Sequence, residues 1–107
     1  MGRKIDLGPI SPLLERIIEK WNPVGIWLFG SRARGTADPE SDWDLLVVAP
    51  DDAPDVDDPL AGWKVRKGTG IVADVLPCRA SEFQDARSVP NTLAYEAAHF
   101  GVLIYER

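Results

Sequence analysis

The chain has 107 residues, with 17 Asp and Glu against 12 Lys and Arg, and a formal net charge of −5 at pH 7. This length fits one domain, and the acidic balance argues against a general nucleic-acid binder, which would be basic. Because Cys78 and His99 are the only residues of their types, an intrachain disulfide framework, a cysteine zinc cluster and a histidine-rich metal site are excluded. With no membrane-length apolar run and no signal-peptide core, we expect one domain over residues 1–107, in the cytoplasm and off the membrane.

Hydrophobic spacing predicts that helices and strands alternate along the chain. Apolar residues recur with a helical period over 13–21, after Ser11 as a helix cap and Pro12 at the first helical position. Ser81 and Gln84 form a capping-box pattern. In chain order we expect a helix over 11–21, a strand over 24–29, a short helix within 31–36, strand 43–49, helix 59–68, strand 71–76, a short helix from 81, helix 90–100 and strand 102–105. This alternation predicts an α/β (α+β) fold with a small mixed β-sheet flanked by helices.

Gly30 and Ser31 follow the first predicted strand and open the next short helix. A helix N-terminus presents unpaired N–H groups and a positive dipole end, which favour phosphate. Glycine lets the backbone approach a ligand closely, and the serine hydroxyl can add one hydrogen bond. The same dipeptide also suits an ordinary turn, so both interpretations stay open.

Asp42 and Asp44 stand on either side of Trp43 at the start of the second predicted strand. Residues two apart share one face of a strand, so both carboxylates point the same way and Trp43 points toward the core. Neighbouring carboxylates repel each other, and a divalent cation removes that repulsion. Oxygen ligands of this kind suit Mg²⁺. A solvated strand start that tolerates paired acids is the alternative.

Asp74 lies in the third predicted strand, on the same face as Val72 and Leu76. A charge within an apolar strand is expensive unless it is paired or bound to a metal. The alternative is an edge strand on which Asp74 faces water. Three acids on two strands, beside a phosphate cradle, are the components of a two-metal site for phosphoryl or nucleotidyl transfer.

The spacing Gly30-Ser31, ten residues, then Asp42-x-Asp44 resembles the Gly-Ser-x10-Asp-x-Asp signature of the DNA polymerase β-like nucleotidyltransferase superfamily. The stretches 29–37 and 41–48 are similar to its minimal nucleotidyltransferase (MNT) branch, and 100–106 resembles the common MNT ending. The resemblance implies a small α/β domain with a mixed sheet. The implied catalytic residues and metal ligands are Asp42, Asp44 and Asp74, and the implied phosphate-binding residues are Gly30 and Ser31. Arg32 and Arg34 flank this pair and could contact the triphosphate, with Arg32 the better nucleotide-binding candidate by proximity; solvated helix residues without a role are the alternative.

The resemblance also implies an activity and a partner. The activity is Mg²⁺-dependent transfer of AMP from ATP, through a two-metal site, to a hydroxyl of a partner protein. Many MNTs are antitoxins of separately encoded HEPN ribonuclease toxins, so a HEPN-domain partner in a hetero-oligomer is expected. Two alternatives stay open: a binding module that neutralises its partner by occlusion, and a stand-alone nucleotidyltransferase acting on a small hydroxylated molecule.

The stretch between Gly35 and Trp63 carries nine acidic residues and no basic residue. Only Asp42 and Asp44 among them are needed for metals. One interpretation is a solvated loop that aids solubility. The other is a lobe whose charge steers a basic partner during association.

Overall fold

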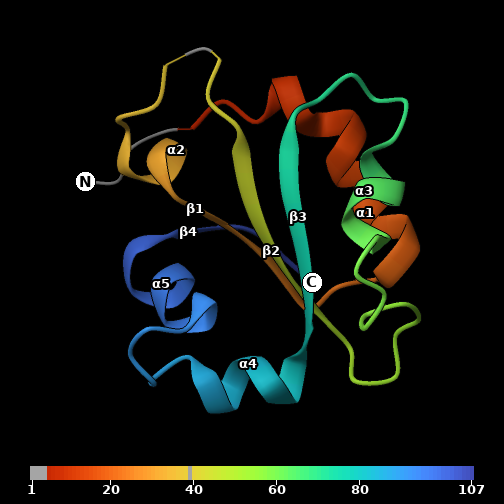
Figure 1. The fold of residues 1–107 in the computed structure, drawn as a ribbon, viewed down its shortest axis with the longest axis vertical. Coiled ribbons are helices and arrows are strands. Elements are labelled where there is room, and N and C mark those ends of the chain that lie inside the picture. The colour runs from red at the N-terminus through yellow and green to blue at the C-terminus, as the bar shows by residue number, and fades with distance from the viewer. Residues whose placement is uncertain (1–4, 39) are drawn as a thin grey trace.

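The computed structural model describes residues 5–38 and 40–107 and is built on a four-stranded sheet in the order β3–β2–β1–β4 (Figure 1). β1 runs antiparallel to both β2 and β4, whereas β2 and β3 are parallel. The sheet is therefore mixed, as predicted. The strands are β1 (Gly25–Phe29), β2 (Trp43–Ala49), β3 (Ala73–Arg79) and β4 (Val102–Glu106).

Helices cover both faces of this sheet and separate its core into two clusters. On one face, α1 and α3 pack against strand residues such as Leu28, Leu45 and Val75. On the other face, α4 and α5 pack against Phe29 and Leu46, because successive strand residues point to opposite sides. The helices are α1 (Ser11–Trp21), α2 (Ser31–Arg34), α3 (Ala61–Arg66), α4 (Ala80–Ala86) and α5 (Leu93–Phe100), with a 3₁₀ turn over Gly8–Ile10 before α1. No helix in the described part of the chain is long and apolar enough to cross a membrane.

The predicted elements are all present, and their ends differ in ways that local contacts explain. β3 starts at Ala73, later than expected, because it pairs residue for residue with β2 from Trp43↔Ala73 onward. The predicted capping box of Ser81 and Gln84 is wrong. The cap lies two residues earlier, at Arg79, whose N–H donates to the Glu82 carboxylate at 3.2 Å, and α4 begins at Ala80. The Ser81 N–H instead donates to Asp51 from the loop after β2, at 2.9 Å.

Helix ends elsewhere also depend on capping. α5 begins at Leu93, not at residue 90, because the Thr92 hydroxyl accepts the Tyr95 N–H at 3.1 Å and caps the helix there. α1 ends at Trp21, and the next residue, Asn22, caps it in a left-handed conformation with φ 46° just before Pro23. α3 has six residues. It is shorter than the expected helix over 59–68, and loops occupy the rest of the connection between β2 and β3.

Candidate active site

Gly30 joins β1 to α2 in a conformation that only glycine adopts easily, with φ 77° and ψ −157°. A Cβ at this position would lie 2.3 Å from the Oδ2 atom of Asp44. The contact follows from the sheet, since the last residue of β1, Phe29, pairs with Asp44 of β2. Glycine therefore allows the start of α2, with half-buried Ser31 as its first residue, to lie directly against the Asp44 carboxylate.

Asp44 and Asp74 are direct partners in the parallel register of β2 and β3. Partner residues on adjacent strands point to the same face, about 4.8 Å apart along the hydrogen-bonding direction. Trp43 points to the opposite face, where it is 7% exposed in the core. Asp42 comes directly before β2 and is exposed. The structure thus gathers the three acids at one end of one face, and it also places Asp74 on an exposed edge strand.

The electrostatics of Asp44 reflect this crowding. Partial burial raises the pKa of the Asp44 carboxyl, the charges of Asp74 and Asp42 raise it further, and Arg34 opposes them. Within the described residues, no ion pair is formed by any of the three acids. The site is a patch of negative charge that Arg34 offsets only in part, and a bound cation would relieve the rest.

The donor set fits Mg²⁺, which takes one or two carboxylates and completes its shell with water and phosphate oxygens. Asp44 and Asp74 supply two neighbouring carboxylates, and Asp42 lies close enough to shift the pKa of Asp44. Among residues 5–38 and 40–107, no three acidic, histidine or cysteine side chains already surround one point. The protein therefore offers part of a coordination shell, to which phosphate oxygens of a bound nucleotide would contribute.

Arg32 and Arg34 leave α2 in different directions. Arg32 donates from Nε and Nη2 to the Ser41 carbonyl oxygen, at 3.0 and 2.6 Å, and its guanidinium lies 4.1 Å from the Trp43 ring centre. It therefore holds the segment that leads into Asp42, a role not predicted from the sequence. Arg34 is exposed, acts electrostatically on Asp44, and lies 3.8 Å from the Glu96 carboxylate. Arg34, which flanks the Gly30-Ser31 junction together with Arg32 in the sequence, is thus a cation close to the acids.

Comparisons with known proteins agree with this site. The family model described as a nucleotidyltransferase domain matches residues 10–96, so the chain belongs to the nucleotidyltransferase domain family. The predicted resemblance to minimal nucleotidyltransferases is confirmed at this level. A search of curated proteins finds no match.

Two solved structures share the fold. One is a Sulfolobus solfataricus protein assigned to the nucleotidyltransferases, with 21% identity, a TM-score of 0.62, and coverage of 94% of this chain and 80% of that one. The other is a chain from a crystal structure of a toxin–antitoxin with AMP-PNP, with 24% identity, a TM-score of 0.62, and coverage of 96% and 75%. At these identities, the likeness shows a shared fold, a mixed sheet flanked by helices.

Proposed function

We propose that this protein is a Mg²⁺-dependent nucleotidyltransferase that moves AMP from ATP to a hydroxyl of a partner protein, as the cytoplasmic antitoxin of a HEPN ribonuclease toxin. The observation that carries the proposal is the pairing of Asp44 with Asp74 beside Gly30. Membership of the nucleotidyltransferase domain family supports the reaction class. The shared fold with a toxin–antitoxin structure that holds AMP-PNP supports the nucleotide and the kind of partner.

Each residue has a role that its position allows. Gly30 and Ser31 present backbone N–H groups at the start of α2, where nucleotide phosphates bind without a side chain in the way. Arg32 is the predicted nucleotide ligand on α2, and exposed Arg34 adds positive charge next to Asp44. Asp42, Asp44 and Asp74 would hold the metals, which supply charge neutralisation and polarisation of the phosphate when bound.

The transfer is a substitution at the α-phosphorus of ATP. The acceptor oxygen forms a bond to that phosphorus while the bond to the bridging α–β oxygen breaks, and pyrophosphate leaves with the electron pair. Asp74 receives the proton of the acceptor hydroxyl. Its place on the exposed edge strand lets a macromolecular hydroxyl reach it. Positioning and charge stabilisation provide the catalysis.

Label transfer tests this function against the occlusion alternative. The protein is purified with its genomic-neighbour partner, incubated with α-³²P-ATP and Mg²⁺, and the partner is examined for covalent label. Labelled partner with wild type, and none with Asp44→Asn, supports transfer. Unlabelled partner that is still neutralised would make the protein a binding module. Label on an added small alcohol alone would indicate a small-molecule substrate.

A further inference from the structure

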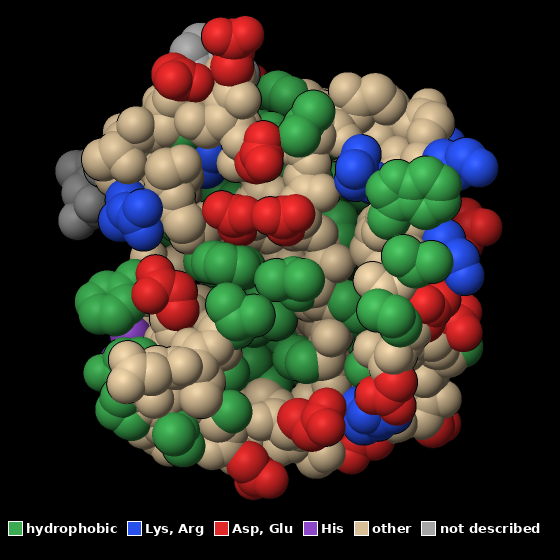
Figure 2. Space-filling model, viewed as in Figure 1, with side chains coloured by type: hydrophobic (Ala, Val, Ile, Leu, Met, Phe, Trp, Pro, Cys, Tyr) green, Lys and Arg blue, Asp and Glu red, His purple; other side chains and the backbone are tan. Residues whose placement is uncertain are grey.

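An apolar groove starts directly beside the acid pair on the same face of the sheet. Leu46 and Leu76 follow Asp44 and Asp74 by two residues on β2 and β3, so they share the acids' face about 6.6 Å further along the strands. Figure 2 shows hydrophobic side chains gathered directly beneath a row of acidic ones in the middle of this face. The reacting centre and the groove are therefore continuous.

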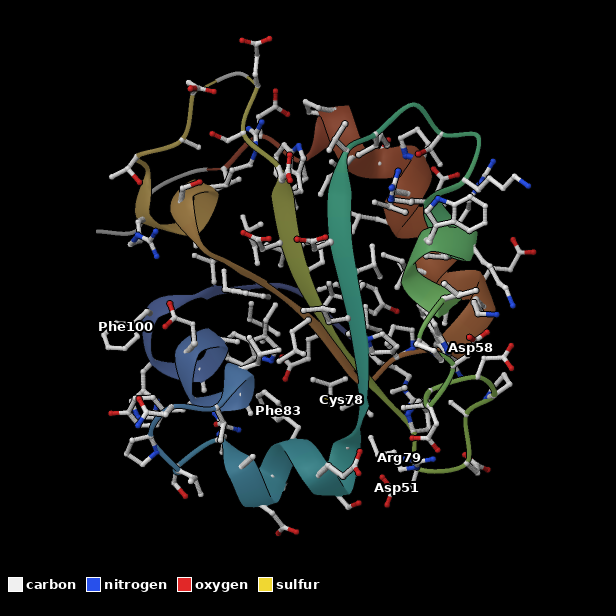
Figure 3. All side chains as sticks on the ribbon, viewed as in Figure 1. Asp51, Asp58, Cys78, Arg79, Phe83 and Phe100 are labelled. Atoms are coloured by element: carbon white, nitrogen blue, oxygen red, sulfur yellow. The ribbon has the colours of Figure 1, made fainter. Side chains whose placement is uncertain are left out.

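The walls of the groove come from three helical segments. Phe83 of α4 and Leu93 of α5 form one side, residues near the start of α3 form the other, and the space measures about 410 Å³. Cys78 of β3 and Phe83 lie side by side at the end of the groove away from the acid pair (Figure 3). Burial, and after it the charge of Glu82, raises the pKa of the Cys78 thiol to about 11, so the thiol itself is uncharged at physiological pH. Leu76 and Leu93 remain 37% and 48% exposed, which leaves apolar surface available to a ligand.

The charges that line the groove have one sign. Asp57, Asp58 and Glu82 are its only charged lining residues in the described chain, and no Lys or Arg lines it. All three have ion-pair partners outside the lining: Arg79 pairs with Asp57 and Glu82, and Lys64 pairs with Asp58. The unpaired negative charge next to the groove therefore comes from the acids of the site. Asp44 and Asp74 do not line the groove, but they lie two residues before its lining residues Leu46 and Leu76 on the same strands, and the whole chain carries −5. Such a surface suits an apolar ligand that carries positive charge and disfavours an anionic one.

We propose that this groove binds the segment of the partner protein that carries the acceptor hydroxyl, a segment with apolar side chains flanked by Lys or Arg. This inference rests on the proposed function and specifies its acceptor. The start of α2 lies against Asp44 from the β1 side, whereas the groove lies along β2 and β3. Nucleotide and acceptor would thus approach the acid pair from opposite sides of β2. The apolar side chains of the partner segment would pack against Leu76 and Leu93, and would place the acceptor hydroxyl next to Asp74.

The test uses a random peptide library displayed on phage, selected on the intact wild-type protein, followed by affinity measurements with the selected peptides in synthetic form. The groove variant is Leu76→Glu with Leu93→Glu, both at exposed positions. The matched control is Leu103→Glu, which is 38% exposed on β4 and outside the groove. We expect selected peptides rich in apolar residues and Lys or Arg. Their affinity should fall at least ~10-fold with the groove variant, as for a loss of central apolar anchors, and stay unchanged with the control. Leu93→Ala should give a smaller loss of peptide affinity, and this variant removes apolar surface without adding a charge.

The results separate the groove from the nucleotide site and from catalysis. ATP affinity in the presence of Mg²⁺ should be the same for wild type and the groove variant. A parallel loss of ATP affinity would assign the groove to the nucleotide base and overturn the proposal, as would selection of acidic peptides or equal peptide binding by the groove variant. Asp44→Asn should keep peptide binding while losing transfer. Peptide binding without any transfer by wild type would refute only the proposed function, and full transfer to the partner by the groove variant would refute only the groove.

Discussion

Two groups of aspartates within one short stretch of chain have opposite electrostatic surroundings. In the site, Asp44 lies beside Asp74 and Asp42, and its pKa is raised by burial and then by their charges. In the loop after β2, Asp51 and Asp57 accept hydrogen bonds from the Ser81 backbone and from Arg79, which lower the pKa of each carboxyl. Ionised Asp44 therefore destabilises the folded state, whereas ionised Asp51 and Asp57 stabilise it.

The loop acids connect the segment between β2 and α3 to its surroundings. Asp57 pairs with Arg79 at the start of α4, and Asp58 accepts the Leu60 N–H and pairs with Lys64 of α3. Figure 3 shows Asp51 and Arg79 together at the end of β3. These partners give the loop acids a structural role, and steering of a basic partner by the remaining charge stays a prediction. The site acids have no ion-pair partners among the described residues, which is the condition that the proposed metal site requires.

The largest effect should come from removing one site carboxylate. Asp44→Asn should lower transfer at least ~10²-fold, because it removes an oxygen ligand and leaves phosphate charge less stabilised. The free energy of unfolding should stay unchanged or rise by roughly 0–1 kcal/mol, since the carboxylate is repelled in the metal-free protein and solvent screens the effect. Label transfer and urea denaturation without metal measure the two quantities.

Asp42→Asn is the companion variant for this prediction. It should lose transfer in the same way and change stability less, because Asp42 is exposed. Destabilisation of several kcal/mol in either variant would mean that these carboxylates stabilise the folded state. The site acids would then resemble the loop acids in their contribution to stability.

Metal dependence of ATP binding should be the next largest effect. Without a divalent cation, the site acids repel phosphate, so EDTA should weaken ATP affinity by roughly 10–100-fold. Calorimetry with ATP, in Mg²⁺ and then in EDTA, measures the difference. The control is Asp44→Asn, in which the gap between the two conditions should narrow. Equal affinity in both conditions would contradict a metal-dependent site.

Gly30→Ala tests whether glycine sets the position of the Asp44 carboxylate. The new Cβ would meet Oδ2 at 2.3 Å in a backbone conformation with φ 77°, so we expect a loss of roughly 1–3 kcal/mol in the free energy of unfolding, together with lower transfer. Gly68→Ala is the matched control, since Gly68 has φ 84° but open space around it. If both variants lose equally, backbone strain alone explains the effect and the contact with Asp44 is unimportant.

Local patterns in the sequence predict more of the fold than of the site's surroundings. Apolar spacing predicts β2 at its observed bounds, and the Gly30-Ser31 junction falls where β1 meets α2. The pairing of Asp44 with Asp74 depends on a register between strands that are far apart in the sequence, which no local pattern fixes. The stacking of Arg32 on Trp43 was missed for a related reason, because it joins a helix to a strand across a loop. The loop acids read as one solvated stretch, since their partners Arg79 and Ser81 come much later in the chain.

The smallest effect should come from the loop, and its pH dependence gives it a distinct signature. Asp57→Asn removes a carboxylate whose pKa is lowered by the hydrogen bond from Arg79. A lowered pKa in the folded state contributes stability above the ordinary carboxyl pKa of about 3.9, and this contribution is lost as the pH falls through the folded value. The unfolding midpoint of Asp57→Asn should therefore lie slightly below that of wild type at pH 7 and coincide with it in strong acid. Asp44→Asn should have the opposite effect, because the pKa of Asp44 is raised. Its unfolding midpoint should equal or exceed that of wild type at pH 7, and the two midpoints should converge as the pH falls and Asp44 is protonated.

Asp52→Asn is the control for charge alone. It removes the same charge from the same loop, at an exposed position for which the described structure has no side-chain hydrogen bond or ion pair. Its unfolding midpoint should equal that of wild type at every pH, because Asp52 has no partner to lose among the described residues. Since Asp52→Asn and Asp57→Asn change the net charge equally, any difference between them reports the pair of Asp57 with Arg79. An equal fall in the unfolding midpoint for Asp52→Asn and Asp57→Asn would mean that the ion pair with Arg79 adds no stability. The loop acids would then differ from the site acids only in how closely their charges are spaced.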